Sequence, residues 1–263
     1  MDPAANLYID LLKLCVSNYV YDDDDDLSGG KSVVDPATGK HAAPDAVHLD
    51  PRLKYYGAMW PSRAHTMIGI PRLDNLQRCV EEVLQGGVKG DLIETGVWRG
   101  GAAIFMRGIL KAYGVTDRQV WVADSFQGLP HADLALYPKE STYAFHEHKE
   151  LAVSLDEVQK NFERYGLLDG QVRFLKGWFR DTLPTAPIGK LALMRLDGDM
   201  YESTMDGLVS LYPKLSSGGI AIIDDYNSVQ ACNFAVDDFR RERGIATELS
   251  LIAGCGAFWR KDH

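Results

Sequence analysis

The sequence predicts an α/β fold: a mostly parallel sheet with helices on both faces, an antiparallel hairpin at its C-terminal end, and an added N-terminal helix and lid. Three observations indicate this fold. Short apolar runs alternate with helix-length amphipathic segments from residue 72 to residue 226, as in repeated βαβ units. Acidic residues follow several of these runs directly, where open α/β sheets place their ligands. Two short strand patterns close the chain and are spaced for a hairpin.

The elements follow in chain order. Apolar residues within 7–16 predict an amphipathic helix, and the acidic, Gly- and Pro-containing stretch after it predicts an arm or lid. The five aspartates at 22–26 lack the spacing of a calcium-binding EF-hand and read as a solvated loop. The remaining predicted elements are helix 72–84, strand 91–94, helix 102–113, strand 120–124, helix 155–165, strand 172–175, strand 191–196, helix 203–215, strand 220–224, helix 230–243, and strands 248–252 and 257–260.

One long connection interrupts the alternation. Residues 131–153 are too many for an ordinary αβ connector, so we expect a lid over the strand ends. We therefore divide the chain into an N-terminal helix and arm, residues 1–65, and a main domain, residues 66–263. No internal repeat or second core is evident.

Composition excludes several classes of protein. The 263 residues are 46% hydrophobic and carry a formal net charge of −9, which fits one full-sized core and argues against a nucleic-acid partner. The four cysteines form no CxxC pair, so neither a disulfide framework nor a zinc site is indicated and a cytoplasmic location is expected. No apolar run approaches a membrane span, so we expect no membrane partner. The apolar face of the N-terminal helix predicts a homo-oligomer, with a dimer as the simplest form.

Four aspartates carry the strongest chemical signal. Asp197 and Asp199 follow one apolar strand, and Asp224 and Asp225 follow the next. If the chain stays extended through Gly198, the first pair faces one cavity, whereas the adjacent second pair converges only if the chain turns there. Oxygen ligands without nearby Cys or His indicate magnesium, manganese or calcium, and magnesium is the expected ion.

A glycine-rich turn follows the first strand of the main domain. In ETGVWRGG, from Glu94 onward, the glycines permit close approach of a ligand and the next helix offers free N–H groups. The dinucleotide fingerprint GxGxxG would need glycine where Trp98 stands, so pyrophosphate binding is disfavoured. An acid at the start of the turn suits a cofactor that bears positive charge.

Two further segments complete a possible nucleoside pocket. Asp124, at the end of the next strand, is placed to accept both hydroxyls of a ribose. Phe126 could cover an adenine face, although a core position is the more usual reading, and Trp178 after Gly177 could close the pocket. Arg195 lies within an apolar strand, and burying its charge without a partner would cost free energy. We therefore expect a carboxylate beside Arg195 and a structural role for it.

Together, ETGVWRGG, WVADSFQGLP, RLDGDMYESTMDGL, YPKLSSGG and IIDDY resemble the macrocin O-methyltransferase family, which includes mycinamicin and novobiocin sugar O-methyltransferases. The resemblance runs from about residue 64 to residue 260 and includes the opening LYIDLLKLCVSNYVY. It implies a class I, Rossmann-like methyltransferase fold, S-adenosylmethionine as methyl donor, magnesium dependence, and a deoxysugar hydroxyl of a small-molecule glycoside as acceptor. Residues 26–60 match no family pattern.

The resemblance also implies roles for particular residues. The metal ligands would be Asp197, Asp224 and Asp225, with Asp199 as general base, although Asp197 and Asp199 could exchange roles. Cofactor contacts would fall on Thr66, Met67, Glu94, Thr95, Gly96, Val97, Trp98, Asp124, Ser125, Phe126, Gly128, Ser154 and Trp178.

The predicted mechanism follows from the weak acidity of a sugar hydroxyl. A cation beside the acceptor would lower the pKa of that hydroxyl, and Asp199 would accept its proton as the oxygen attacks the methyl group. His65, His146 or His148 could serve as the base instead. Three alternatives stay open: a catechol-type phenolic O-methyltransferase, an NAD-dependent oxidoreductase, and a sugar-binding module without catalysis.

Overall fold

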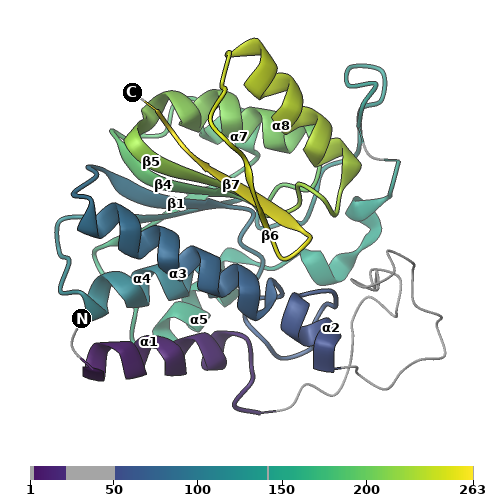
Figure 1. The fold of residues 1–263 in the computed structure, drawn as a ribbon. Coiled ribbons are helices and arrows are strands. Elements are labelled where there is room, and N and C mark those ends of the chain that lie inside the picture. The colour runs from purple at the N-terminus through teal and green to yellow at the C-terminus, as the bar shows by residue number, and fades with distance from the viewer. Residues whose placement is uncertain (1–2, 22–50, 141, 263) are drawn as a thin grey trace.

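The fold rests on a seven-stranded sheet in the order β3-β2-β1-β4-β5-β7-β6 (Figure 1). This computed structural model describes residues 3–21, 51–140 and 142–262. The first five strands pair in parallel, and β7 pairs antiparallel with both β5 and β6. The strands are β1 (Asp91–Thr95), β2 (Val120–Asp124), β3 (Val172–Lys176), β4 (Leu191–Leu196), β5 (Leu215–Ile223), β6 (Ser250–Ile252) and β7 (Gly256–Arg260). The predicted parallel sheet and its C-terminal antiparallel hairpin are confirmed.

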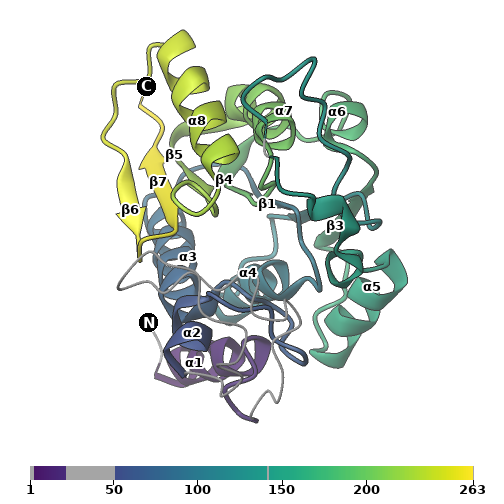
Figure 2. The same cartoon turned by 90° about the vertical axis from the view of Figure 1, so that its right-hand side faces the viewer.

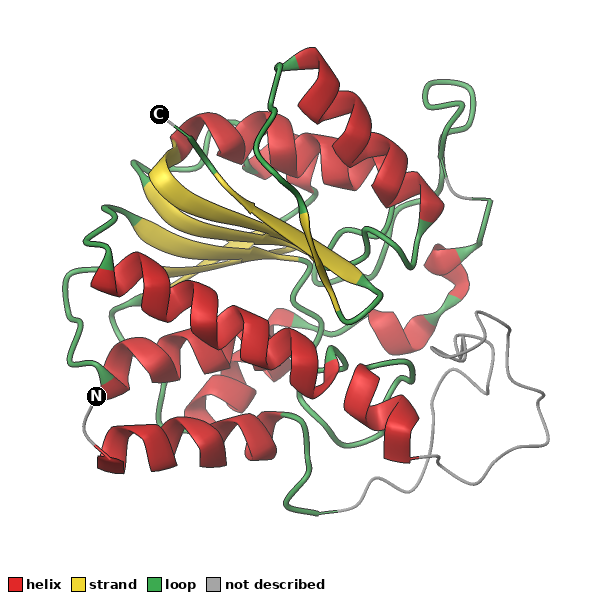
Figure 3. Ribbon diagram, in the orientation of Figure 1, coloured by secondary structure: helices red, strands yellow, loops and turns green. Residues whose placement is uncertain are grey.

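Helices cover both faces of this sheet (Figures 2 and 3). Helices α1, α3, α4 and α5 lie on one face, while α6, α7 and α8 lie on the other. The helices are α1 (Pro3–Val16), α2 (Pro51–Tyr56), α3 (Gly69–Gln85), α4 (Gly101–Ala112), α5 (Leu155–Arg164), α6 (Phe179–Thr182), α7 (Tyr201–Leu211) and α8 (Gln230–Glu242), with 3-10 turns at Phe145–Glu147, Lys149–Leu151 and Tyr212–Lys214.

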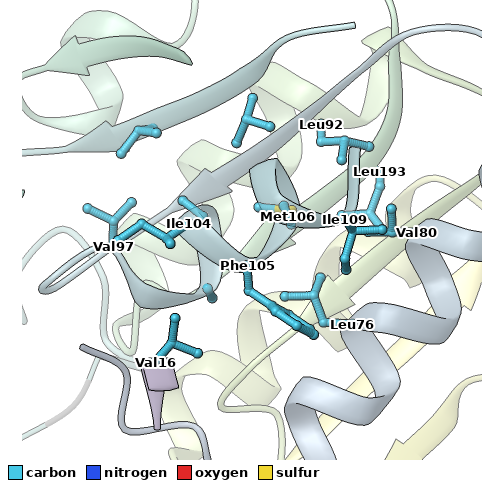
Figure 4. Close-up of a cluster of buried hydrophobic side chains, with 14 of the residues drawn as sticks. Val16, Leu76, Val80, Leu92, Val97, Ile104, Phe105, Met106, Ile109 and Leu193 are labelled. Atoms are coloured by element: carbon cyan, nitrogen blue, oxygen red, sulfur yellow. The ribbon is translucent and has the colours of Figure 1, made fainter. Parts of the chain in front are cut away.

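Alternate residues of each central strand point to opposite faces of the sheet and pack in two apolar layers. On one side Leu92 of β1 belongs to the same cluster as Phe105 of α4 and Leu76 of α3, and Figure 4 shows Phe105 beside Leu76. On the other side Ile93 of the same strand joins residues of α7 and α8. This alternation follows from the two-residue period of a strand, so β1 and its neighbours are buried on both faces.

The N-terminal helix belongs to the main core. Ile9, Leu12 and Val16 are buried against α4 and share its apolar layer. A Cβ at Gly108 of α4 would come 2.1 Å from Leu12 Cδ2, so a side chain there would push α1 away. Residues 22–50 of the predicted arm lie outside the described residues, its later part contains the unpredicted helix α2 (Pro51–Tyr56), and the division at residue 65 stays a prediction.

Helix ends depart from the sequence prediction where proline intervenes. Helix α3 begins at Gly69, three residues early, because Pro71 is tolerated in a first helical turn. The predicted helix 203–215 instead ends at Leu211, and a 3-10 turn containing Pro213 leads into β5. None of the helices in the described ranges is long and apolar enough for a membrane span.

Candidate active site

A cavity of about 450 Å³ opens at the carboxyl ends of the parallel strands. Its walls come from the segments that follow β1, β2, β3, β4 and β5, together with residues 57–60 and 66–68 before α3. This is the edge at which open α/β sheets bind ligands. Of the predicted cofactor contacts, ten line it: Thr66, Met67, Glu94, Gly96, Val97, Trp98, Asp124, Ser125, Gly128 and Trp178.

The glycine-rich turn after β1 packs directly against the end of β4. Gly96 has a φ of +76°, and a Cβ there would lie 1.6 Å from the carbonyl oxygen of Asp197. The amide of Asp197 in turn donates to Thr95 O at 2.9 Å. Glycine at 96 is therefore required for the close approach of the two strand ends, which brings Glu94 and Asp197 into one site.

Asp124 holds the turns after β1 and β2 together. Its Oδ2 accepts from the Val97 amide at 2.7 Å, and its Oδ1 accepts from the Phe126 amide at 2.7 Å. Burial raises the pKa of Asp124, while these amide hydrogen bonds oppose the rise. The carboxylate faces the cavity from a fixed position, and its contact with a ribose stays a prediction.

Three predicted cofactor contacts do not line the cavity. Thr95 is buried within β1, and Phe126 packs in the apolar layer that contains α4. The hydroxyl of Ser154 accepts from the Glu157 amide and caps α5. A strand end, a core position and a helix cap explain these residues without a ligand.

Glu94 and Arg195 form a buried ion pair at the base of the cavity. Arg195 Nη1 donates to Glu94 Oε1 at 2.6 Å and to Asp197 Oδ2 at 3.0 Å. Burial nevertheless raises the pKa of Glu94 to about 8, since Asp197 and Asp224 repel its charge as well. Glu94 Oε2 is enclosed and accepts no hydrogen bond of ordinary geometry among the described residues, although the Ala103 amide at the start of α4 favours the charged form.

A second buried arginine ties the segment before α3 to this network. Arg72 donates from Nη1 to Asp224 Oδ2, from Nη2 to Gly57 O at 2.9 Å, and from Nε to Ile68 O at 2.7 Å. Arg195 Nη2 donates to the other oxygen, Asp224 Oδ1. Asp224 thus links two arginines, and the expected carboxylate partners of Arg195 are confirmed.

Three carboxylates approach closely enough to share one cation. Oxygen atoms of Asp197, Asp199 and Asp225 all lie within 4.8 Å of one another. Burial raises the pKa of Asp197 to about 6 and that of Asp199 to about 8, and it also raises the pKa of Asp225, with repulsion by Asp224 adding to each shift. Asp225 Oδ2 is buried without a hydrogen-bond partner among the described residues.

Asp197 and Asp199 do not reach the cavity as alternate residues of one extended strand. β4 ends at Leu196, and Asp199 has a φ of +54°, so the chain leaves the extended conformation by Asp199 and the condition of an extended backbone is not met. Both Asp197 and Asp199 nevertheless line the same cavity. The turn after β5 likewise brings Asp224 and Asp225 to that cavity, which sequence alone left open.

The geometry favours a different set of cation ligands from the sequence prediction. The predicted ligands were Asp197, Asp224 and Asp225, but both oxygens of Asp224 accept from arginines. Asp199 instead completes the compact trio. Assignment of Asp224 as a ligand therefore stays a prediction that these ion pairs do not support.

The histidines considered as alternative bases do not line the cavity. His65 Nδ1 lies 2.7 Å from Tyr165 Oη, and burial lowers its pKa to about 4. His148 Nε2 lies 2.8 Å from Tyr143 Oη, and the ring of His146 lies against that of His131. Within the described ranges, none of the cavity-lining residues is a histidine.

Sequence reasoning missed several residues of the cavity wall. Met59 and Trp60 fall in a stretch without periodicity, and Arg180 and Glu202 form a 3.1 Å pair between the starts of α6 and α7. Cys255, in the hairpin turn, also lines the cavity. The spacing of hydrophobic residues could not identify them, because they lie in turns and in the first turns of helices, where hydrophobic residues do not recur at a regular interval.

The long connection before α5 does contribute to the cavity. Tyr143, Phe145 and Leu151 line it, as expected for a lid, and Leu129 and Pro130 line it just before the predicted lid begins. Its first half is tied down by Glu140, which accepts from the amides of Tyr201 and Glu202 at 2.9 Å each.

Known proteins are similar to this chain in both sequence and fold. The family described as macrocin O-methyltransferase (TylF) matches residues 5–261. The chain is 54% identical over 260 residues to the 8-demethyl-8-(2,3-dimethoxy-alpha-L-rhamnosyl)-tetracenomycin-C 4'-O-methyltransferase of Streptomyces olivaceus, covering 98% of this chain and 94% of that protein. It is 51% identical to the mycinamicin III 3''-O-methyltransferase of Micromonospora griseorubida, covering 99% of each.

Solved structures agree with these relatives. The O-methyltransferase NovP superposes with a TM-score of 0.87 at 47% identity, over 98% of this chain and 100% of that one. The calicheamicin methyltransferase CalS11 has a TM-score of 0.58 at 18% identity, over 99% of this chain and 93% of its own, which shows a shared fold only.

Proposed function

The chain belongs to the macrocin O-methyltransferase family, and from this premise we propose that it transfers a methyl group from S-adenosylmethionine to a deoxysugar hydroxyl of a glycosylated natural product. The observation that carries the proposal is one cavity holding both the Glu94 turn and the carboxylate trio. The names of the relatives, which include a rhamnosyl-tetracenomycin and a mycinamicin methyltransferase, support a glycoside of antibiotic type as acceptor.

The turn after β1 fits a cationic methyl donor. Glu94 Oε2 is buried, accepts no hydrogen bond of ordinary geometry among the described residues, and is adjacent to the cavity, so a ligand with an ammonium or sulfonium group would favour its ionised form. Asp124 is fixed by amides at the end of the next strand, where it would accept ribose hydroxyls. The side chain of Trp178 lines the same region and would cover an aromatic base.

The trio Asp197, Asp199 and Asp225 fits a magnesium ion. Three carboxylates with raised pKa values, of which Asp225 is buried and Asp197 and Asp199 are partly exposed, are costly to ionise together, and a divalent cation would relieve their repulsion. Magnesium, when bound, would supply the positive charge that lowers the pKa of an acceptor hydroxyl. Asp224 would then position Arg72 and Arg195 around the site.

Asp199 is the proton acceptor in this proposal. The acceptor hydroxyl loses its proton as its oxygen forms a bond to the donor methyl, so a base must lie at the site. No histidine or lysine is among the described residues that line the cavity, which leaves its carboxylates as the strongest candidates. Arg195 and Arg72 hold the neighbouring carboxylates Asp197 and Asp224 in place, and Asp199 lines the same cavity.

We also propose the remaining features that the sequence predicts. These are an N-terminal helix and arm over residues 1–65 that serve the domain over residues 66–263, a cytoplasmic location and a homodimer. Supporting the location, all four cysteines are free. Supporting the dimer, Leu7, Leu11 and Leu14 are exposed at helical spacing on α1.

The direct test supplies the protein with S-adenosylmethionine, magnesium and acceptors of the kinds named in its relatives. Mycinamicin III, demethyldecarbamoylnovobiocin and 8-demethyl-8-(2,3-dimethoxy-alpha-L-rhamnosyl)-tetracenomycin C form the panel, with their aglycones as matched controls. Mass spectrometry should show one added methyl on a sugar of at least one glycoside and none on the aglycones. Methylation of the aglycone alone, or of a catechol in preference, would contradict the proposal.

A further inference from the structure

Trp98 occupies a backbone conformation that disfavours side chains. Its φ is +48°, in the left-handed region where glycine is the usual residue. This is also the position at which a dinucleotide fingerprint would carry glycine. A bulky residue kept in a strained conformation beside a cavity points to a contact that only its side chain makes.

That contact joins the turn to the lid. Trp98 Nε1 donates to Glu150 O at 2.9 Å, within the 3-10 turn Lys149–Leu151. The next residue, Leu151, lines the cavity, as do Tyr143 and Phe145 earlier in the lid. We name Tyr143, Phe145 and Leu151 the lid wall. Glu140 ties the first half of the lid to α7, so Trp98 holds the half that faces the cavity.

The neighbouring Arg99 holds the opposite wall. Its Nη1 donates to the carbonyls of Pro61, Ser62 and Ala64 at 3.2, 3.0 and 2.9 Å, and its guanidinium lies 4.2 Å from the Trp98 ring centroid. These carbonyls directly follow Met59 and Trp60, which we name the arm wall.

A third contact fixes the same segment. The Gly101 amide donates to His65 O at 2.8 Å, and a Cβ at Gly101 would come 2.4 Å from that oxygen. The two walls also meet each other, because the Trp60 and His148 rings pack edge to face at 4.9 Å. The turn after β1 is therefore attached to both segments that enclose the cavity.

We propose that Trp98 and Arg99 are positioning residues that fix the lid wall and the arm wall on the cofactor turn, so that acceptor affinity depends on them. The proposal rests on the proposed function in assigning these walls to the acceptor. Glu94, Gly96 and Asp124 would hold the cofactor independently of either contact. Loss of one contact should therefore loosen its own wall and weaken acceptor binding more than cofactor binding.

Hydrogen exchange of the protein without added ligands tests the attachment itself. Trp98→Phe keeps an aromatic ring in the cavity but deletes the N–H donor, and Trp121→Phe is its control because Trp121 Nε1 donates to Asp91 Oδ2 at 2.9 Å in the strands β1 and β2. Amides of residues 142–151 should exchange roughly threefold to tenfold faster in Trp98→Phe than in Trp121→Phe. Equal exchange in both variants would overturn the role of Trp98.

The attachment of the arm wall is tested by a test variant and a control variant that both replace an arginine with lysine. Arg99→Lys should speed exchange over residues 57–65 by a similar factor, whereas Arg118→Lys, which alters a single bond to Gly90 O, should not. If Arg99→Lys loosens the lid and the arm equally, the separate attachment of the two walls is wrong.

Kinetics test the consequence for the acceptor. With whichever panel glycoside is methylated, Arg99→Lys, at a residue outside the predicted cofactor contacts, should raise the acceptor KM roughly threefold to tenfold, while the Kd of S-adenosylhomocysteine changes by less than about twofold. A comparable rise in both constants would overturn the assignment of these walls to the acceptor. If no glycoside is methylated, the proposed function fails, and hydrogen exchange still decides whether the two residues position the walls.

Discussion

Arg195 Nη1 lies 2.6 Å from Glu94 Oε1, and both side chains are almost completely buried. This pair joins the end of β4 to the end of β1 beneath the cavity. Because the same guanidinium also holds Asp197 and Asp224, one residue fixes carboxylates from three strand ends. The cofactor acid and the cation site are therefore parts of one electrostatic network.

Removal of this arginine should destabilise the whole domain. Arg195→Met keeps much of the side-chain volume but leaves buried carboxylates without their cation, so we expect the free energy of unfolding to fall by about 3–5 kcal/mol. Urea denaturation measures this change. Arg260→Met, at an exposed pair with Glu82, is the control and should cost less than about 1 kcal/mol. Similar small losses in both variants would contradict the structural role of Arg195.

Glu94→Gln tests the acid of the glycine-rich turn. The substitution preserves shape and a hydrogen-bond acceptor for Arg195 but removes the charge that would favour a cationic ligand. Calorimetry should show S-adenosylmethionine binding weakened roughly tenfold or more. Glu82→Gln, on the surface of α3, should leave the affinity unchanged. Unaltered binding in Glu94→Gln would exclude Glu94 from the cofactor site.

Sequence pattern located the sheet well because its strands are buried on both faces and end in turn residues. The strands Val120–Asp124 and Leu191–Leu196 have the predicted bounds. The family resemblance likewise identified the segments that meet in the cavity. What pattern could not provide was the direction of each side chain after a strand ends.

Asp199 and Asp224 show this limit. A left-handed residue at 199 and two arginines from distant elements around Asp224 decide which carboxylates converge. Neither feature produces a periodic pattern in the sequence. Arg72, for example, is 152 residues away from its partner Asp224. Met59 and Trp60 were missed for the same reason, since only the fold brings them to the cavity.

Asp199→Asn should impair the chemical step selectively. Loss of a positioned proton acceptor reduces kcat by about 10²–10⁴-fold. The Kd of S-adenosylhomocysteine should change by less than about twofold, because Asp199 lies outside the turn that would hold the cofactor. Asp237→Asn, on α8, serves as the control for an aspartate away from the cavity. A near-normal kcat in Asp199→Asn would remove Asp199 from this role.

Stability without added cations should decrease as the pH rises from 6.5 to about 8. Folded Glu94 and Asp199 have pKa values of about 8, whereas unfolded carboxyls have lost their protons well below this range. The folded state therefore binds more protons, and the free energy of unfolding falls with pH. His65 acts in the opposite direction, but only below pH 6.5, because its pKa is lowered to about 4.

Thermal unfolding in chelator across this range measures the effect. Asp199→Asn removes one of the titrating groups and should flatten the slope, by up to about 1.4 kcal/mol per pH unit. Stability that increases between pH 6.5 and 8 in the unsubstituted protein would show that these carboxyls are already ionised in the folded state.

The proposed cation site assigns different roles to the neighbouring residues Asp224 and Asp225. Asp225→Asn should raise the magnesium concentration needed for half-maximal rate roughly tenfold or more, since its free oxygen belongs to the trio. Asp224→Asn should chiefly lower stability, because it breaks contacts with Arg72 and Arg195. The reverse pattern would make Asp224 a ligand in place of Asp225.

The most direct test of the account is the initial rate of sugar methylation as a function of free magnesium. Protein stripped with a chelator should show almost no methyl transfer, and added magnesium should restore the rate along a saturation curve that Asp225→Asn shifts to higher concentration. Full activity in the presence of chelator would contradict a cation at Asp197, Asp199 and Asp225.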